Sequence, residues 1–338
     1  MTFNWVECSR EARPREGISA MSLQVVLDES FEARVETVTD ASPLDPHQVR
    51  VQVACAGLNF WEVLQRRGRA PIPASRRLGT EGAGVVQEVG AAVTDFRPGQ
   101  RVAWSRVPGS FAEAVVAPAT ALVSVPQEVD DAAAGALLFQ GQTASYLCHH
   151  TWPLERGETA VVTAAAGGVG QLLSQLLSAS GVRVIGVVSS EAKTDAARAA
   201  GASDVLLYGD GLAEDVRALA PGGVSAVYDA VGAGVAEPLL RTLRPRGAMV
   251  LYGSASGRDA DISAKDLGAG SFYLTRTAGR DYLGTDEQMR ATGEQLLQWV
   301  IDGTVRPTIG ATYPLAEVGR ALDDLESRRT IGKVLLRP

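Results

Sequence analysis

The sequence predicts an α/β protein in which a β-rich domain is followed by a doubly wound parallel sheet. Three observations support this prediction. A glycine-rich turn links a buried strand to an apolar helix, strands and helices alternate from about residue 141, and short strands separated by Pro and Gly precede that point. A chain of 338 residues is long enough for two domains with separate cores.

The glycine-rich turn lies within residues 159–177, TAVVTAAAGGVGQLLSQLL. The spacing Ala165-x-Gly167-x-x-Gly170 is the dinucleotide-binding fingerprint with alanine at the first glycine position. Gly167 lets the backbone approach a pyrophosphate, and Gly170 lets the helix pack closely on the strand. The free N–H groups at the start of the helix attract phosphate. The turn therefore predicts a bound dinucleotide cofactor.

The residues after the next strand, 183–188, predict which dinucleotide binds. An enzyme that selects NAD places Asp or Glu about 20 residues after the fingerprint, where it holds the ribose 2′-hydroxyl. This chain has Ser189 and Ser190 there, followed by Lys193. Hydroxyls and an ammonium suit a 2′-phosphate. Glu191 would favour NAD if it turned inward, and Lys193 could instead be a solvated lysine, but the pattern as a whole favours NADPH.

Composition and charge exclude several other classes. The net charge of −7 and the lack of a basic face argue against nucleic acid as a partner. The sequence contains no run of 18 apolar residues, so it predicts no membrane span. Residues 1–20 mix Glu and Arg and lack an apolar core, so we expect an N-terminal extension rather than a secretory signal. Three cysteines without metal or disulfide spacing fit a cytoplasmic protein.

Hydrophobic periodicity divides the chain into three parts. Residues 21–140 are expected to be β-rich, with strands at 23–27, 49–54, 84–89, 101–104 and 112–116. Residues 141–280 are expected to alternate strands at 160–164, 183–188, 204–207, 225–229 and 247–252 with helices at 169–180, 191–200, 212–219 and 234–243. Residues 281–338 carry an expected helix at 286–302 and a strand at 333–336, and should complete the first domain.

Ordered motifs extend along the chain from about residue 22 to its end. They are Gly57–Phe60 (GLNF), Leu78–Val85 (LGTEGAGV), Arg97–Val102 (RPGQRV), Ala164–Gly170, Tyr228–Gly232, Leu243–Gly247, Gly253–Gly257, Tyr273–Arg276 and Glu326–Lys333. With these motifs the chain resembles the zinc-independent quinone oxidoreductases, the zeta-crystallin-like family of the medium-chain dehydrogenase/reductase superfamily. The resemblance implies a GroES-like catalytic domain at 21–140 completed by 281–338, a Rossmann NADPH-binding domain at 141–280, and usually a homodimer.

The chain departs from the zinc-dependent relatives of this superfamily. Those relatives have a Cys where this chain has Asn59 and a His where it has Thr80, and they carry a four-cysteine lobe that is missing here. A catalytic zinc needs three protein ligands, and the histidines stand only at 47, 149 and 150. We therefore expect no metal. Hydride transfer without a Lewis acid favours an acceptor with its own electron sink, such as a quinone or an enone.

The resemblance also implies site residues. The cofactor is expected along Asn59, Thr143, Gly167, Gly168, Val169, Gly170, Ser189, Ser190, Lys193, Tyr208, Tyr252, Gly253 and Ser254. Lys193 and Tyr208 would hold the 2′-phosphate, although Tyr208 could be a strand-end aromatic residue. Arg328 and Lys333 would either reach the cofactor or cap the last strand. As catalytic residues we expect Asn59 and Thr143, which would orient the carboxamide or the substrate oxygen, and Tyr252, which would form a wall beside the nicotinamide.

The expected substrate pocket departs from the family pattern at three positions. Leu64 and Ala70 stand where bacterial quinone reductases usually have tyrosines, so the pocket should be more open and more apolar. Trp61 adds bulk nearby. These residues favour a larger apolar substrate over a small quinone. Gln140 and Gln142 complete the set; Gln142 replaces a usual apolar residue and could bond the substrate or cap a helix.

The loop at 66–77, RRGRAPIPASRR, holds five arginines. Such a run is usually a solvated loop. It could instead be an anion-reading lip for a phosphopantetheine arm, coenzyme A or an acidic carrier protein. Because the preceding LNF-x-x-VL segment resembles the enoylreductase domains of polyketide synthases, a stand-alone enoylreductase is an alternative to a quinone or enone reductase.

The sequence also bears on two other classes of function. One is a low-turnover NADPH-binding protein, since some relatives serve as lens crystallins or bind RNA; the acidic balance counts against RNA. The other is a hydrolase, which is disfavoured because no G-x-S-x-G elbow is present and Gly253–Gly257 has Ala255 at the nucleophile position.

Overall fold

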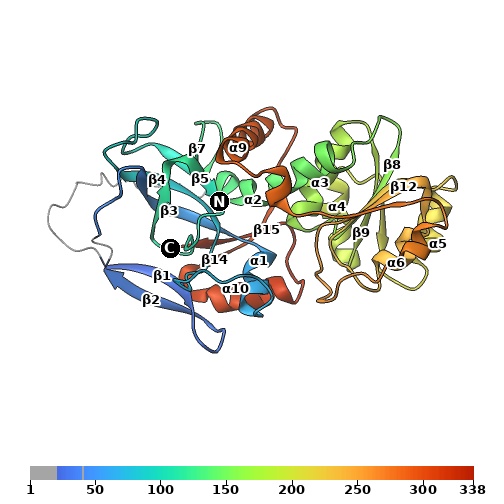
Figure 1. Cartoon of the computed structure of the whole chain (residues 1–338), viewed down its shortest axis with the longest axis horizontal. Coiled ribbons are helices and arrows are strands. Elements are labelled where there is room, and N and C mark those ends of the chain that lie inside the picture. Colours follow the sequence, from blue (N-terminus) through green and yellow to red (C-terminus); the bar gives the residue numbers. More distant parts are fainter. Residues whose placement is uncertain (1–20, 40–41) are drawn as a thin grey trace, which may run out of the picture.

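The computed structural model describes residues 21–39 and 42–338, and its strands form two lobes along the long axis of the molecule (Figure 1). The extension predicted at residues 1–20 lies outside the described residues. The chain forms the strands of the second lobe between residues 159 and 276 and then returns to the first lobe, where its C-terminus lies.

The second lobe is built on a six-stranded parallel sheet in the order β10-β9-β8-β11-β12-β13. Numbered from β8, this order is 3-2-1-4-5-6, that of the doubly wound dinucleotide-binding fold. The predicted fold class is therefore confirmed. The strands are β8 (Thr159–Thr163), β9 (Arg183–Val188), β10 (Asp204–Leu207), β11 (Val224–Asp229), β12 (Leu243–Leu251) and β13 (Tyr273–Arg276).

Helices cover both faces of this sheet, which explains why its strands are continuous apolar runs. Leu172 and Leu176 of α3 pack in one core, and Leu212 and Val216 of α5 pack in a separate core. The helices of this lobe are α3 (Gly168–Ala179), α4 (Thr194–Ala199), α5 (Leu212–Leu219), α6 (Ala236–Leu240), α7 (Ala264–Leu267) and α8 (Gly279–Tyr282).

The first lobe contains a seven-stranded sheet in the order β14-β15-β3-β4-β5-β7, with β6 paired to β3. A hairpin of β1 and β2 packs beside it. The C-terminal tail joins this sheet because β15 pairs antiparallel with β3, Val334 opposite Leu58. The strands are β1 (Met21–Leu27), β2 (Ala33–Thr39), β3 (Gln48–Leu58), β4 (Glu81–Val89), β5 (Arg101–Ser105), β6 (Ala114–Pro118), β7 (Leu122–Ser124), β14 (Ile309–Pro314) and β15 (Lys333–Arg337).

Helix α2 (Asp131–Tyr146) links the lobes, since it packs on β3 and β4 of the first sheet and on α3 of the second lobe. The Asp130 side chain caps it by accepting the Ala133 N–H at 2.7 Å. The domain boundary proposed at residue 140 falls inside this helix. The other helices are α1 (Phe60–Arg66) and α10 (Val318–Glu326), which pack on each other, and α9 (Asp286–Ile301), which packs on α2.

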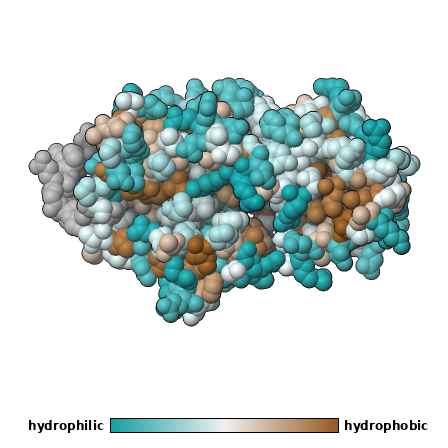
Figure 2. Space-filling model, in the orientation of Figure 1, coloured by the Kyte–Doolittle hydropathy of each residue, from teal (hydrophilic) through white to brown (hydrophobic). Residues whose placement is uncertain are grey.

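The face seen in Figure 2 is mostly hydrophilic, with apolar patches on both lobes. In the part of the chain that the structure describes, no helix is both long enough and apolar enough to cross a membrane.

Candidate active site

The glycine-rich turn between β8 and α3 has the geometry of an anion-binding site. Gly167 precedes the first helical residue with an extended backbone, and no side chain within the described ranges caps the helix. A Cβ on Gly170 would lie 2.3 Å from the Ala164 carbonyl oxygen, so the helix could not pack this closely with a larger residue. The uncapped N–H groups and the helix dipole together favour a phosphate group at this point.

Two side chains from other elements support the turn. Ala164 has φ of 49°, which is uncommon for a residue with a Cβ. Its N–H donates to the Tyr208 hydroxyl oxygen at 2.7 Å. Gln140 of α2 lies against Gly168, where an added Cβ would come within 1.8 Å of Gln140 Oε1. Tyr208 therefore holds the turn from the end of β10, and Gln140, which was predicted in the substrate pocket, contacts the turn.

A pair of cations lies beside Ser189 and Ser190, which are exposed at the end of β9. Lys193 Nζ donates to the Arg328 carbonyl oxygen at 2.6 Å, and Arg328 Nη2 donates to the Ala255 carbonyl oxygen at 2.9 Å. Burial lowers the pKa of Lys193, and the positive charge of Arg328 lowers it further. A bound dianion would relieve this repulsion. These residues therefore fit the 2′-phosphate of NADPH.

The carboxyl ends of β8, β11 and β12 meet in a hydrogen-bonded network. Thr163 Oγ1 donates to Asp229 Oδ1 at 2.8 Å, and the Tyr252 N–H donates to the Asp229 carbonyl oxygen at 2.9 Å. Burial, reinforced by Asp229, raises the pKa of Tyr252 well above its ordinary value, so its phenol stays protonated. Tyr252, Gly253 and Ser254 thus follow β12 at the edge where open α/β sheets bind ligands.

Thr143 lies beside an aromatic pair that the sequence analysis did not select. Its hydroxyl donates to the Phe139 carbonyl oxygen at 3.1 Å. The Tyr146 ring stacks on Tyr282 with centroids 4.5 Å apart. Burial raises the pKa of the Tyr146 phenol, while hydrogen bonds with Thr277 and Thr143 oppose that rise. No motif marks this pair, because its two rings come from elements far apart in the sequence.

Asn59 is buried at the start of α1, inside a network of charged side chains. Lys333 Nζ donates to Asn59 Oδ1 at 2.7 Å and also to the Glu81 carboxylate. Asn59 Nδ2 donates to Glu81 Oε2 at 3.2 Å and to the Gly57 carbonyl oxygen at 3.3 Å. The other Glu81 oxygen accepts the Phe139 N–H at 2.7 Å. Both polar atoms of the Asn59 side chain are therefore engaged by the protein.

This network corrects one prediction. Lys333 was expected either to reach the cofactor or to cap the last strand, but its side chain is 2% exposed and is held by Asn59 and Glu81. The physical reason is that the fully buried Glu81 carboxylate requires a cation beside it. For Asn59, whose polar atoms are engaged, we propose a positioning role rather than direct contact with substrate.

The residues around Asn59 do not fit a zinc ion. Asn59 and Thr80 offer weaker ligands than Cys and His. The Lys333 ammonium bonds Asn59 and Glu81, and Thr80 Oγ1 donates to Glu62 Oε1 at 2.7 Å. Residues 21–39 and 42–338 contain no group of three or more His, Cys, Asp or Glu side chains that could hold a metal.

Glu62, in the same network, gives a pH prediction. Burial raises its pKa to about 7, although hydrogen bonds from Thr80 and the Asn59 N–H oppose that rise. The folded protein therefore keeps the proton to higher pH than the unfolded chain does. As the pH rises from about 4.5 to about 7, the free energy of unfolding should fall by roughly 2–3 kcal/mol. Glu62→Gln, which cannot ionise, should remove this dependence in urea unfolding measured at pH 5 and pH 8.

The exposed Glu294→Gln variant is the matched control and should keep the wild-type pH dependence. If Glu62→Gln also keeps it in full, another group is responsible and our assignment to Glu62 is wrong.

Three predicted pocket residues lie together at α1 and the loop that follows it. Trp61 and Leu64 are partly exposed on α1, and the Ala70 N–H donates to the Leu64 carbonyl oxygen at 3.2 Å. This turn brings Leu64 and Ala70 side by side, as expected if both border one opening.

Gln142 does not belong to this group. It is 3% exposed, its Oε1 accepts the Ser105 hydroxyl at 2.9 Å, and its Nε2 donates to the Met289 carbonyl oxygen at 3.1 Å. The prediction that Gln142 lines the substrate pocket is wrong, because a buried amide must satisfy its donors and acceptor and does so here within the protein.

The arginines of the 66–77 loop point to different partners. Arg66 binds Asp323 at 2.8 Å and also Glu326, which Arg67 shares. Arg76 Nε donates to the Leu27 carbonyl oxygen at 2.6 Å. These contacts count against the hypothesis that the five arginines form one anion-reading lip, because local carboxylates and carbonyls already bind three of them.

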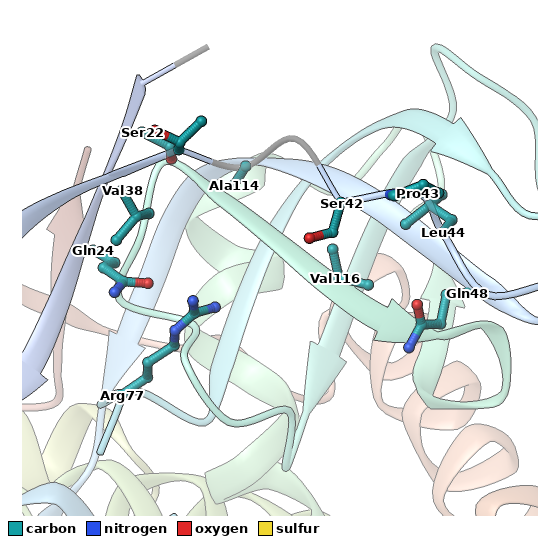
Figure 3. Close-up of a pocket in the computed structure, with 11 residues that line it drawn as sticks. Ser22, Gln24, Val38, Ser42, Pro43, Leu44, Gln48, Arg77, Ala114 and Val116 are labelled. Carbon is teal, nitrogen blue, oxygen red and sulfur yellow. The ribbon is translucent and has the colours of Figure 1, made fainter. Parts of the chain in front are cut away.

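Of the two other arginines in that loop, Arg69 and Arg77, Arg77 points into a cavity of about 260 Å³ on the first lobe (Figure 3). The cavity is lined mainly by polar and small side chains, and it contains none of the predicted site residues. Among those that Figure 3 labels are Ser22, Gln24, Gln48 and Ala114. The cavity is separate from the candidate site.

Together the fold and the site define a two-lobed, nucleotide-dependent oxidoreductase. Family models agree: residues 45–127 match the alcohol dehydrogenase GroES-like domain, and residues 168–301 match the family described as zinc-binding dehydrogenase. The chain is 38% identical over 298 residues to a quinone oxidoreductase of Pseudomonas aeruginosa, covering 87% of this chain and 92% of that relative. The chain belongs to the quinone oxidoreductase family of the medium-chain dehydrogenase/reductase superfamily.

Other relatives extend this comparison. The chain is 35% identical over 318 residues to a 2-haloacrylate reductase of a Burkholderia species, covering 90% of this chain and 94% of the relative. Among solved structures, Escherichia coli quinone oxidoreductase complexed with NADPH superimposes with a TM-score of 0.86 at 30% identity, covering 94% of this chain and 99% of that structure's chain. The family predicted from the motifs is confirmed.

Proposed function

We propose that the chain is an NADPH-dependent reductase that transfers hydride to a quinone or to an α,β-unsaturated carbonyl. The single observation that carries the cofactor choice is the cation pair of Lys193 and Arg328 beside Ser189 and Ser190. The enzyme class is that of the family, and NADPH is the cofactor named for the solved Escherichia coli relative.

Each part of the site has a proposed role toward the cofactor, which supplies a hydride when bound. The turn of Gly167, Gly168, Val169 and Gly170 would bind the pyrophosphate with its N–H groups. Arg328, Lys193, Tyr208 and the two serines would hold the 2′-phosphate. Thr143, Tyr252, Gly253 and Ser254 would line the nicotinamide end.

The acceptor oxygen needs a hydrogen-bond donor as negative charge develops on it. Tyr146 is suited to this role, because burial raises the pKa of its phenol and stacking on Tyr282 holds its ring in place. For a quinone or an enone, solvent can supply the final proton, so the protein need only bind, orient and exclude water.

Reversing the charge of Lys193 tests the cofactor assignment. Lys193→Glu should repel the 2′-phosphate and should lower kcat/KM for NADPH by about 10- to 100-fold, since charged hydrogen bonds contribute roughly 1.5–3 kcal/mol. The value for NADH should change little. Steady-state kinetics with both cofactors measure the ratio. Lys265→Glu, at an exposed position outside the candidate site, is the control. Equal losses with NADPH and NADH would contradict the assignment.

The acceptor is tested by NADPH oxidation with a polycyclic ortho-quinone and an enoyl thioester side by side. We expect faster turnover of the quinone. One observation favours the thioester: a segment of a pikromycin polyketide synthase component of Streptomyces venezuelae is 34% identical over 301 residues, although these are only 8% of that protein. Against it, three of the five loop arginines have local partners. NADPH binding without turnover of either acceptor would favour a low-turnover binding protein.

We also propose a homodimer in the cytoplasm. β13 is an edge strand of the parallel sheet, and its Tyr273 side chain is 50% exposed while its ring lies 4.9 Å from that of Trp152. An open edge of this kind suits pairing with a second copy. Sedimentation analysis of the wild type and of a Tyr273→Asp variant tests it, and a monomeric wild type would contradict it.

A further inference from the structure

Arg106, directly after β5, combines two unusual features. Its φ is 62°, a left-handed conformation that costs free energy for a residue with a side chain and that collects at functional sites. Its guanidinium is half-buried yet has no carboxylate within 4.0 Å among the residues described. Within the described ranges the guanidinium makes one hydrogen bond, from Nη1 to the Leu283 carbonyl oxygen at 3.3 Å. By contrast, Arg101 on the same strand binds Asp131 at 2.7 Å.

The surroundings of Arg106 place it beside the proposed acceptor site. A Cβ added to Gly279 would lie 2.8 Å from Arg106 Nη2 and 3.6 Å from Tyr146 Cε1, so the guanidinium and the Tyr146 ring meet at this glycine. Tyr146 in turn lies close enough to Thr143 for that side chain to affect the pKa of its phenol. The Tyr146 side chain therefore lies between the Arg106 guanidinium and Thr143.

An unpaired, partly desolvated guanidinium needs an anion. Burial lowers the pKa of Arg106, which reflects the cost of keeping this charge away from water. Protein carboxylates compensate such a cost elsewhere in the lobe, as Asp323 does for Arg66. Since the residues that the structure describes supply none at Arg106, a ligand with a planar anionic group would gain a charge-assisted, two-point hydrogen bond there.

We propose that Arg106 binds a carboxylate carried by the acceptor, so that the substrate class is a conjugated carbonyl compound or quinone bearing a carboxylate. This inference rests on the proposed function and deepens it. In the case of a conjugated acid, hydride from NADPH adds at the β-carbon and a solvent proton adds at the α-carbon. NADPH is thereby oxidised by two electrons and the carbon–carbon double bond is reduced, while the carboxylate itself is unchanged.

The ion pair would also assist this reaction. A free carboxylate is a poor electron sink because of its negative charge. Pairing with the guanidinium withdraws electron density from it, and the charge that develops on the acceptor is then stabilised where it forms. Arg106 would thus determine specificity and contribute to the rate.

The test compares a benzoquinone carrying a carboxymethyl arm with its methyl ester, so that the ring is the same and only the charge differs. Arg106→Met should raise KM for the acid by about 10- to 100-fold and leave the ester within about twofold. Arg106→Lys should lose part of this effect, since it keeps the charge but not the fork. Arg280→Met is the matched control, because Arg280 is 84% exposed and follows Gly279.

The outcomes separate this inference from the proposed function. Equal losses for acid and ester, or a raised KM for NADPH in Arg106→Met, would overturn the inference and indicate a structural or cofactor role. If the wild type reduces neither compound, the proposed function fails. In that case the inference is still tested by thermal stabilisation with benzoate, which should occur in the wild type and be lost in Arg106→Met; no stabilisation of the wild type would overturn it.

Discussion

Replacing Lys333 with methionine is expected to destabilise the protein by about 3–5 kcal/mol, because it leaves a buried carboxylate without its cation. Glu81 is fully buried, and Lys333 and the Asn59 amide provide its charged and polar contacts on one side. Urea unfolding followed by circular dichroism measures the loss. Lys265→Met removes the same charge from an exposed position and should leave stability within about 0.5 kcal/mol.

The double variant Lys333→Met/Glu81→Gln identifies the cause. If the uncompensated charge is responsible, the neutral amide should restore part of the lost stability, and the double-mutant cycle should give a clear coupling energy. A loss below about 1 kcal/mol for Lys333→Met, or additive losses in the double variant, would show that the buried pair does not hold this site together.

Gly167→Val should abolish most cofactor affinity without unfolding the protein. A Cβ at Gly167 would meet only the Ala164 carbonyl oxygen, at 3.2 Å, and φ of −83° suits valine, so the fold should tolerate the change. The added side chain would occupy the space that a pyrophosphate needs. We expect the Kd for NADPH, measured by isothermal titration, to rise about 10- to 100-fold, as overpacking by roughly 1–3 kcal/mol implies.

Valine variants of two other glycines serve as comparisons for Gly167→Val. Gly222→Val adds the same bulk where no atom of residues 21–39 or 42–338 lies within 4 Å of the added Cβ, and it should keep NADPH affinity. Gly170→Val would place its Cβ 2.3 Å from the Ala164 carbonyl oxygen and should unfold the turn itself. If Gly167→Val binds NADPH as well as the wild type, the pyrophosphate lies elsewhere.

The fold of the second lobe was largely predictable. β9 (Arg183–Val188), β10 (Asp204–Leu207) and α5 (Leu212–Leu219) occupy the predicted ranges, because parallel strands buried on both faces are continuous apolar runs and α5 is amphipathic. The first lobe was less predictable. α2 was missed since its small and apolar residues are buried on nearly all sides, so no helical period appears, and β2 (Ala33–Thr39) was missed because it is mostly exposed.

The candidate site also has a part that the sequence predicts and a part that only the folded structure shows. The turn at Gly167, the two serines and Lys193 were predicted because their spacing along one strand–turn–helix unit carries the chemistry. Lys333 was misassigned because its partners Asn59 and Glu81 lie 274 and 252 residues away, which no local pattern reveals. Arg106 and Tyr146 were not selected for the same reason: only the packing of Gly279 against both brings them together.

The most direct test of the central claim is a single-turnover reaction with a quinone and with NADPH deuterated on one or the other face of C4. Our account predicts that quinone-dependent NADPH oxidation by the purified protein slows several-fold for the label on one face, is unchanged for the other, and is insensitive to a zinc chelator. No quinone-dependent oxidation above the protein-free rate, or no difference between the two labels, would contradict direct hydride transfer from NADPH.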